Sequence, residues 1–111
     1  MIEKIIIDYL FPILELPVTA THPEHDPEAF VIVERVGGGM TNRVRHATVA
    51  IQSYGPTMLD AAQLHEQVLA AMTGIAALNE IGSCSLNSEY NYTDEETKHY
   101  RYQAVFDLFY Y

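Results

Sequence analysis

The chain has 111 residues, of which 49% are hydrophobic and 19% charged, and its formal net charge is −9. We expect one folded domain over residues 1–111, because this length and composition suffice for a hydrophobic core and differ from those of a disordered segment. The negative charge argues against a general binder of nucleic acids or of anionic membranes, since both need a cationic surface.

An amphipathic helix is predicted at the start of the chain. Its apolar residues recur at steps of three and four and form one stripe, which comprises Ile2, Ile5, Ile6, Tyr9, Leu10 and Ile13. Pro12 removes a backbone donor, so the helix is predicted to kink or to end within residues 9–16. Asp8 interrupts the apolar run, which is also shorter than the roughly 20 residues that span a bilayer. We therefore expect no signal peptide and a soluble, intracellular product.

A β-hairpin over residues 30–54 is predicted to anchor the fold. Residues 16–21 before it suit a short edge strand, and residues 21–29, which are rich in proline and acids, suit an exposed connection. Both runs of the hairpin alternate with a period of two, which is typical of strands.

The middle of this hairpin is predicted to be a long, mobile loop that carries positive charge. Gly37, Gly38 and Gly39 tolerate positive φ values, as does Asn42, so we expect the chain to reverse there. Half of the six lysines and arginines lie in or beside this loop, namely Arg35, Arg43 and Arg45. The sequence therefore predicts a basic finger on an acidic protein.

The main helix and two strands complete the chain. Thr57, with Asp60 three residues later, resembles a capping box that opens a helix. The apolar stripe of this helix comprises Ala61, Leu64, Val68, Met72 and Ile75. Its exit is predicted at Asn79, Gly82 and Ser83. A short strand over residues 86–92 and an acidic turn over residues 94–96 precede a last strand over residues 100–110, which is apolar on both faces.

These elements predict an α+β fold with a mainly antiparallel sheet and two helices packed on one face. Because the last strand is apolar on both faces, the second face of the sheet needs a cover as well. In a small domain that cover is expected to come from another subunit, which favours an oligomer.

His22, His25 and Asp26 are the nearest approach to a metal site. Two imidazoles and a carboxylate would bind zinc if one more histidine joined them, the candidates being His46, His65 and His99. The spacing is weak support, because two histidines in a proline-broken surface loop are common without a metal. We therefore expect neither a metal nor another cofactor.

No motif predicts an enzyme. The glycine run lacks the Lys and the Ser or Thr of a P-loop, and also the spacing of a dinucleotide fingerprint. Cys84 is the only cysteine, so it forms no intramolecular disulfide, and no base is predicted beside it. Ser53 and Ser83 lie in no nucleophile-elbow pattern. The tyrosines of the last strand lack the basic neighbours that single-stranded nucleic acid requires, so we expect no specific nucleic-acid binding.

Several segments resemble the small tail terminator or tail completion proteins of long-tailed bacteriophages. The resemblance is carried by EAFVIVERVGGG, VRHATVAIQSYG, TMLDAAQLHEQVLAAM and KHYRYQAVFDLFYY. Proteins of this kind have an α+β fold and form a hexameric ring on the end of the tail tube, where they stop tube growth and dock the head connector. The resemblance implies a structural component of a phage or prophage tail, found in the virion tail and, during assembly, in the host cytoplasm.

The resemblance also implies a position for the basic finger, at a subunit interface or at the lumen of the ring. The interface candidates are Arg35, Gly37, Gly38, Gly39, Met40, Arg43 and Arg45. Their charge would meet an acidic segment of a neighbouring subunit, either residues 24–28 or residues 94–96, and would set the orientation of the two copies.

Three other functions stay open at this point. A neck or connector protein on the head side of the joint would form rings too, but would bind the portal. A small acidic inhibitor that masks a basic partner suits the charge of −9, although the basic finger fits it poorly. A metal-dependent enzyme that uses His22 and His25 ranks last.

Overall fold

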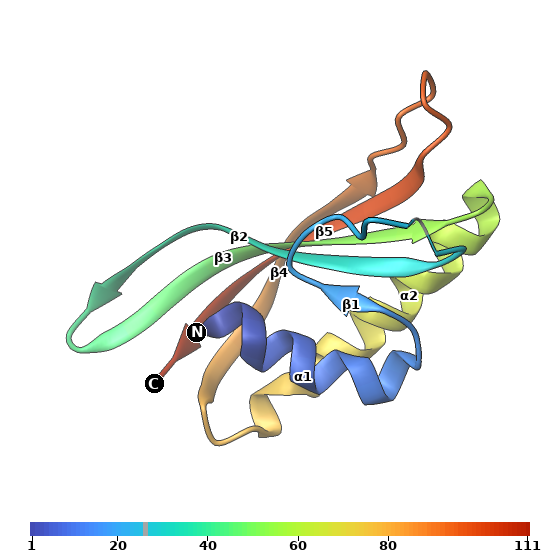
Figure 1. The fold of residues 1–111 in the computed structure, drawn as a ribbon. Coiled ribbons are helices and arrows are strands. Elements are labelled where there is room, and N and C mark those ends of the chain that lie inside the picture. Colours follow the sequence, from blue (N-terminus) through green and yellow to red (C-terminus); the bar gives the residue numbers. More distant parts are fainter. Residues whose placement is uncertain (26) are drawn as a thin grey trace.

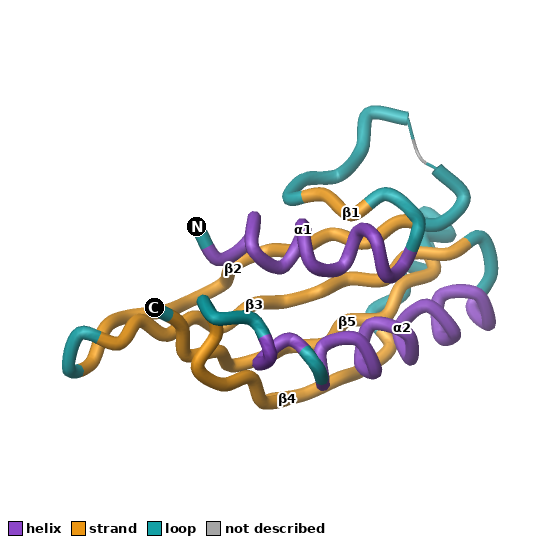
Figure 2. Tube along the Cα trace, turned by 90° about the horizontal axis from the view of Figure 1, so that it is seen from below, coloured by secondary structure: helices purple, strands orange, loops and turns teal. Residues whose placement is uncertain are grey.

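Two helices lie against one face of a five-stranded sheet in the computed structural model, which describes residues 1–25 and 27–111 (Figure 1, Figure 2). The elements in chain order are α1 (Ile2–Leu14), β1 (Val18–Thr19), β2 (Phe30–Thr41), β3 (Val44–Gly55), α2 (Met58–Thr73), the 3₁₀ turn η1 (Ile75–Ala77), β4 (Ile81–Asn91) and β5 (Tyr100–Tyr110). The predicted α+β class, with a mainly antiparallel sheet and both helices on one face, is confirmed.

The strands follow the order β1-β2-β3-β5-β4 across the sheet. β1 runs parallel to β2, with Val18 opposite Val31, and every other neighbouring pair of described strands is antiparallel. β1 is the short edge strand predicted within residues 16–21. Because it covers only the beginning of β2, the rest of β2 forms one edge of the sheet, and β4 forms the other.

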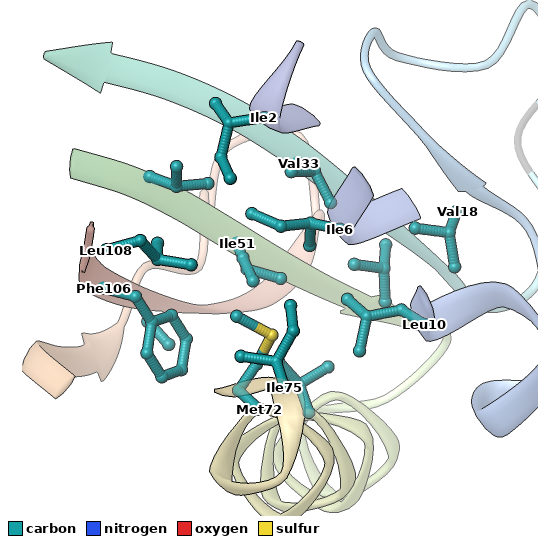
Figure 3. Close-up of a cluster of buried hydrophobic side chains, with 14 of the residues drawn as sticks. Ile2, Ile6, Leu10, Val18, Val33, Ile51, Met72, Ile75, Phe106 and Leu108 are labelled. Atoms are coloured by element: carbon teal, nitrogen blue, oxygen red, sulfur yellow. The ribbon is translucent and has the colours of Figure 1, made fainter. Parts of the chain in front are cut away.

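The main core lies between the helices and the sheet, as Figure 3 shows. α1 buries Ile2, Ile6, Leu10 and Leu14, which follow one another at steps of four. The predicted stripe is therefore wrong at Ile13, whose side chain is 50% exposed. The helix ends at Leu14, inside the predicted window. Neither α1 nor any other helix in the described part of the chain is long and apolar enough to cross a membrane.

α2 forms as the sequence predicts. The Thr57 hydroxyl accepts a hydrogen bond from the Asp60 backbone N–H at 3.1 Å, so Thr57 satisfies one of the free donors of the first turn. All five residues of the predicted stripe are buried: Ala61, Leu64, Val68, Met72 and Ile75. Ile75 lies just beyond the helix in η1, which continues the apolar face toward β4.

The opposite face of the sheet is covered only at one end. A second buried cluster there comprises Phe30, Ile32 and Tyr54. The His22 ring, from the β1–β2 connection, lies edge-on to the Phe30 ring with 5.3 Å between the centroids. Beside this cluster, Gln52 Nε2 donates to Gln103 Oε1 at 2.8 Å across β3 and β5. At this end residues of the same chain thus cover the apolar second face.

β4 is longer than the sequence predicts. It begins at Ile81, five positions before the predicted start at Leu86. Gly82 and Ser83, predicted to lie in the exit from the helix, therefore belong to a strand. Ser83 pairs with Phe109 of β5, and Gly82 lies at the irregularity between the paired residues Ile81 and Ser83, where glycine is common.

Candidate assembly interface

The far end of the β2–β3 hairpin projects beyond both helices (Figure 1, Figure 2). We call residues 35–45 the arm. Met40 lies opposite Arg45 within the hairpin, and Arg45 is the last residue of β3 that also pairs with β5. All of β2 from Glu34 onward is exposed. The arm contains every residue that the sequence nominates for an assembly interface.

The chain reverses at the tip of the arm and not at the glycines, so the predicted long loop is wrong. Only Asn42 and Arg43 separate β2 from β3, with φ values of 51° and 67°. Two consecutive positive φ values are typical of a type I′ turn, whose twist matches that of the flanking strands. Asn42 is the residue by which the sequence indicates this turn, because asparagine is among the residues that favour it.

The glycines permit close packing inside the arm. A Cβ atom on Gly39 would lie 2.8 Å from Nε2 of His46, and one on Gly38 would lie 2.6 Å from the His46 carbonyl oxygen. His46 therefore lies against the glycine run, while its ring contacts that of Phe109 with 5.9 Å between the centroids. Larger residues at these two positions would push the strands of the arm apart.

The three arginines of the arm have different surroundings. Arg35 Nε donates to the Gly37 carbonyl at 3.1 Å. Arg45 Nη2 donates to the Tyr111 carbonyl at 2.6 Å, and its guanidinium lies 4.8 Å from the centre of the Tyr110 ring. Arg43, at the tip, is exposed and has no hydrogen bond or ion pair to any other residue that the structure describes. Arg45 therefore binds within its own chain, and Arg43 is the arginine best placed to contact another chain.

The outer edge of β2 carries uncovered apolar side chains. Val36 is 56% exposed and Met40 is 64% exposed. Val36 occupies a bulge, because the pairing with β3 shifts between Arg35 and Gly37. From Val33 to the tip, no described strand pairs with this edge of β2, so its backbone groups face outward.

The other edge of the sheet, β4, borders an open groove against α2. The groove has a volume of about 260 Å³ and is lined by Leu69, Met72, Thr73, Cys84, Leu86 and Phe106. Leu86 is 46% exposed at its rim. On the same face of β4, Glu89 Oε1 lies 2.9 Å from Nε2 of the buried His65.

The proposed metal ligands do not gather into a site among the described residues. His22 and His99 approach each other with 5.8 Å between ring centroids, and both belong to the aromatic cluster around Tyr54. His25 is exposed, and Asp26 lies outside the described residues. Within residues 1–25 and 27–111, no three histidine, cysteine, aspartate or glutamate side chains are arranged to hold one metal ion.

Two candidate nucleophiles lie in surroundings that suppress reactivity. The hydroxyl of Ser53 is buried and has no hydrogen-bond partner among the described residues. His65 and Glu89 form a pair on the same face of the sheet, but neither is hydrogen-bonded to this hydroxyl. A substrate would not reach it in this conformation. Burial, together with the charge of Asp107, raises the pKa of the Cys84 thiol from 9.0 to about 11, so the nucleophilic thiolate is scarce at neutral pH.

The chain matches no model of a known protein family and no curated protein at a significant level.

Proposed function

We propose that this protein is a structural component of a phage or prophage tail, a terminator-like protein that forms a ring at the end of the tail tube. Its partners in this proposal are further copies of itself, the tube, and the head connector that docks on the ring. The proposal includes no catalytic step and no cofactor. Its location is the virion tail, after assembly in the host cytoplasm.

The arm is the observation that carries this proposal. The β3 residues opposite the arm pair with β5 as far as Arg45, whereas no described strand pairs with the β2 side of the arm, so the arm presents a free sheet edge to a partner. The arm also exposes Val36 and Met40 and carries the unpartnered charge of Arg43. Exposed apolar side chains next to charges of one sign favour a protein partner whose surface carries the opposite sign.

The acidic remainder of the chain supplies such a surface. The chain holds 15 acidic residues against six lysines and arginines, and three of those six lie in the arm. A second copy therefore offers a largely negative surface for the arm of the first to contact. Contacts between unlike surfaces of identical copies are heterologous, and they close into a ring when the rotation between copies allows it.

Light scattering on the purified protein at several concentrations, followed by electron microscopy of the largest species, tests the proposal. We expect closed rings, six copies by the resemblance to tail terminators. A strict monomer that also fails to bind isolated tail tubes would refute the proposal and favour the acidic inhibitor. Rings that bind a portal but not a tube would instead identify a head-side connector.

A charge-reversal pair sharpens this test. Arg43→Glu should weaken ring formation, because it replaces the free positive charge at the tip of the arm. Lys4→Glu makes the same change of charge on the exposed side of α1, where Lys4 forms an ion pair with Asp8 of its own helix, and should leave the rings intact. Equal ring formation by both variants would refute the charge pairing.

A further inference from the structure

Both edges of the sheet lack a neighbouring strand among the described residues, and their free lengths are similar, residues 33–41 of β2 and residues 81–91 of β4. β2 is free from Val33 to Thr41, because β1 pairs only with Val31 and Ile32. β4 is free on its outer side over its whole length, which ends at Asn91. Unpaired edges present rows of N–H and C=O groups that pair readily with a strand of another chain.

The direction of the strands decides how two copies would join. Successive strands β2, β3, β5 and β4 alternate in direction, so β4 runs opposite to β2. Copies related by rotation about an axis along the strands keep these directions. The β4 strand of one copy, placed beside β2 of the next, is then antiparallel to it and continues the alternation across the joint.

The side chains on the helix-facing side of the two edges complement one another in one register. On β2 these positions are Arg35, Gly38 and Met40, since the first two lie opposite Val49 and Ala47 of the core face. On β4 they are Glu89, Leu86 and Cys84, which lie opposite Ala104, Phe106 and Leu108. Antiparallel pairing of Arg35 with Glu89 brings Gly38 opposite Leu86 and Met40 opposite Cys84, because the spacings along the two strands are equal.

The bulges of the two strands fit this register. Val36 forms the bulge of β2 and lies between Arg35 and Gly38, while one of the two irregularities of β4 falls between Leu86 and Ser88 and the other lies between Ile81 and Ser83. Each strand therefore has two residues between the Arg35–Glu89 contact and the Gly38–Leu86 contact. At its far end the register sets Asn91 opposite Val33, so β4 ends next to Thr19, the last residue of β1 in the neighbouring copy.

Charge and shape agree with the same alignment. Arg35 meets Glu89, whose side chain is 42% exposed despite its contact with His65. Gly38 adds no side chain of its own opposite Leu86, and the Arg35 guanidinium that lies over Gly38 in the single chain would turn toward Glu89 in the joint. Met40 lies over the groove beside β4, whose lining is largely apolar. A flexible, unbranched methionine adapts well to such a groove.

We propose that β2 of one copy pairs with β4 of the next as antiparallel neighbours, with Arg35 opposite Glu89 and Met40 opposite Cys84. The inference rests on the proposed ring and specifies its subunit joint, a sheet that continues from copy to copy. Each copy contributes its β2 edge to one neighbour and its β4 edge to the other, so the contact is heterologous.

A Met40→Cys variant tests this joint against the native Cys84. Within one chain β3 and β5 separate these residues, so they are roughly three strand spacings, or 14 Å, apart, which is too far for a disulfide. Any disulfide between them must therefore link two copies. Oxidation is carried out at about pH 9 with a chemical oxidant, because Cys84 forms its thiolate reluctantly. The products are separated on a non-reducing gel.

We expect a ladder that extends beyond the dimer, since each copy of the variant holds the introduced thiol on β2 and the native thiol on β4, which bond to different neighbours. Leu59→Cys, at the start of α2, is an equally exposed control and should give no ladder. The ladder should be absent from the double variant that combines Met40→Cys with Cys84→Ser. Circular dichroism of each reduced variant verifies that it is folded.

The outcomes separate the joint from the proposed function. Large species in light scattering without a Met40→Cys ladder would overturn the β2–β4 joint and leave the ring standing. A product that stops at the dimer would also overturn the joint, because it indicates a symmetric contact. A monomer at every concentration that gives no ladder and binds no isolated tail tubes would overturn both.

Discussion

The packing of α1 yields a quantitative prediction from two isoleucines on one helix. Ile6 is fully buried between α1 and the sheet, whereas Ile13 is half-exposed. Ile6→Ala removes three buried carbons, which at roughly 0.8 kcal/mol each is a transfer loss of about 2.4 kcal/mol. The cavity left behind brings the expected loss of unfolding free energy to about 3–4 kcal/mol. Ile13→Ala should cost about 1 kcal/mol or less, because half of its surface is already in water and no enclosed cavity forms.

Urea unfolding, followed by far-UV circular dichroism, measures both losses. The two variants share the gain in helix propensity from alanine, so the difference between them reports burial alone. Protein concentration is held low and constant, because self-association would add apparent stability. Equal losses for the two variants would refute the described orientation of α1, in which the buried line runs through Ile6 and Leu10 to Leu14.

Three further predictions concern local interactions. Thr57→Ala should lower the unfolding free energy by about 1 kcal/mol through loss of the α2 cap, whereas Thr57→Ser should retain most of it. Glu89→Ala should cost about 1–3 kcal/mol in the same urea assay, because His65 would have neither ring nitrogen partnered, and Glu66→Ala on the exposed side of α2 should cost little. Alkylation of Cys84 in the folded protein at pH 8 should be roughly a hundredfold slower than in the urea-unfolded chain, because the thiolate is that much rarer. Folding raises the pKa of this thiol from 9.0 to about 11, so the thiol makes its full contribution to the unfolding free energy below pH 9, and this contribution is lost as the pH rises to 11. A rise in the unfolding free energy between pH 9 and pH 11 would contradict this prediction.

The elements with strong periodic signals are those that the sequence predicts well. α2 combines a capping box with a regular stripe, and burial in β5 alternates from Ala104 to Tyr110, so local pattern and tertiary packing agree there. The sequence misplaces Ile13 because steps of three and four leave two neighbouring lines on a helix, and only contact with the sheet selects one of them. Gly82 lies in β4 because its partner strand is present, which its own propensity does not reveal.

The composition of the arm identifies the candidate interface, but the free sheet edges that would form this interface depend on the order of the strands. The arginines and glycines of the arm stand out in the sequence, whereas the free edge of β2 exists only because β1 stops after two residues. The same holds for β4, which is an edge because β5 inserts beside β3. No local pattern carries that information, since it arises from pairings between residues far apart in the chain.

The character of these edges bears on whether a partner covers them. Sheet edges that stay in water are commonly blocked by lysines, prolines or inward-pointing charges, which discourage pairing with other chains. The free part of β2 holds neither lysine nor proline, and its glycine run keeps the backbone accessible. β4 likewise has no lysine and no proline over its length. An isolated chain with two such edges of opposite direction would be prone to open-ended association. The edges do carry bulges and two charged residues on their helix-facing side, Arg35 on β2 and Glu89 on β4. Closure of the same contacts into the proposed ring would pair both edges at once and set these opposite charges against one another.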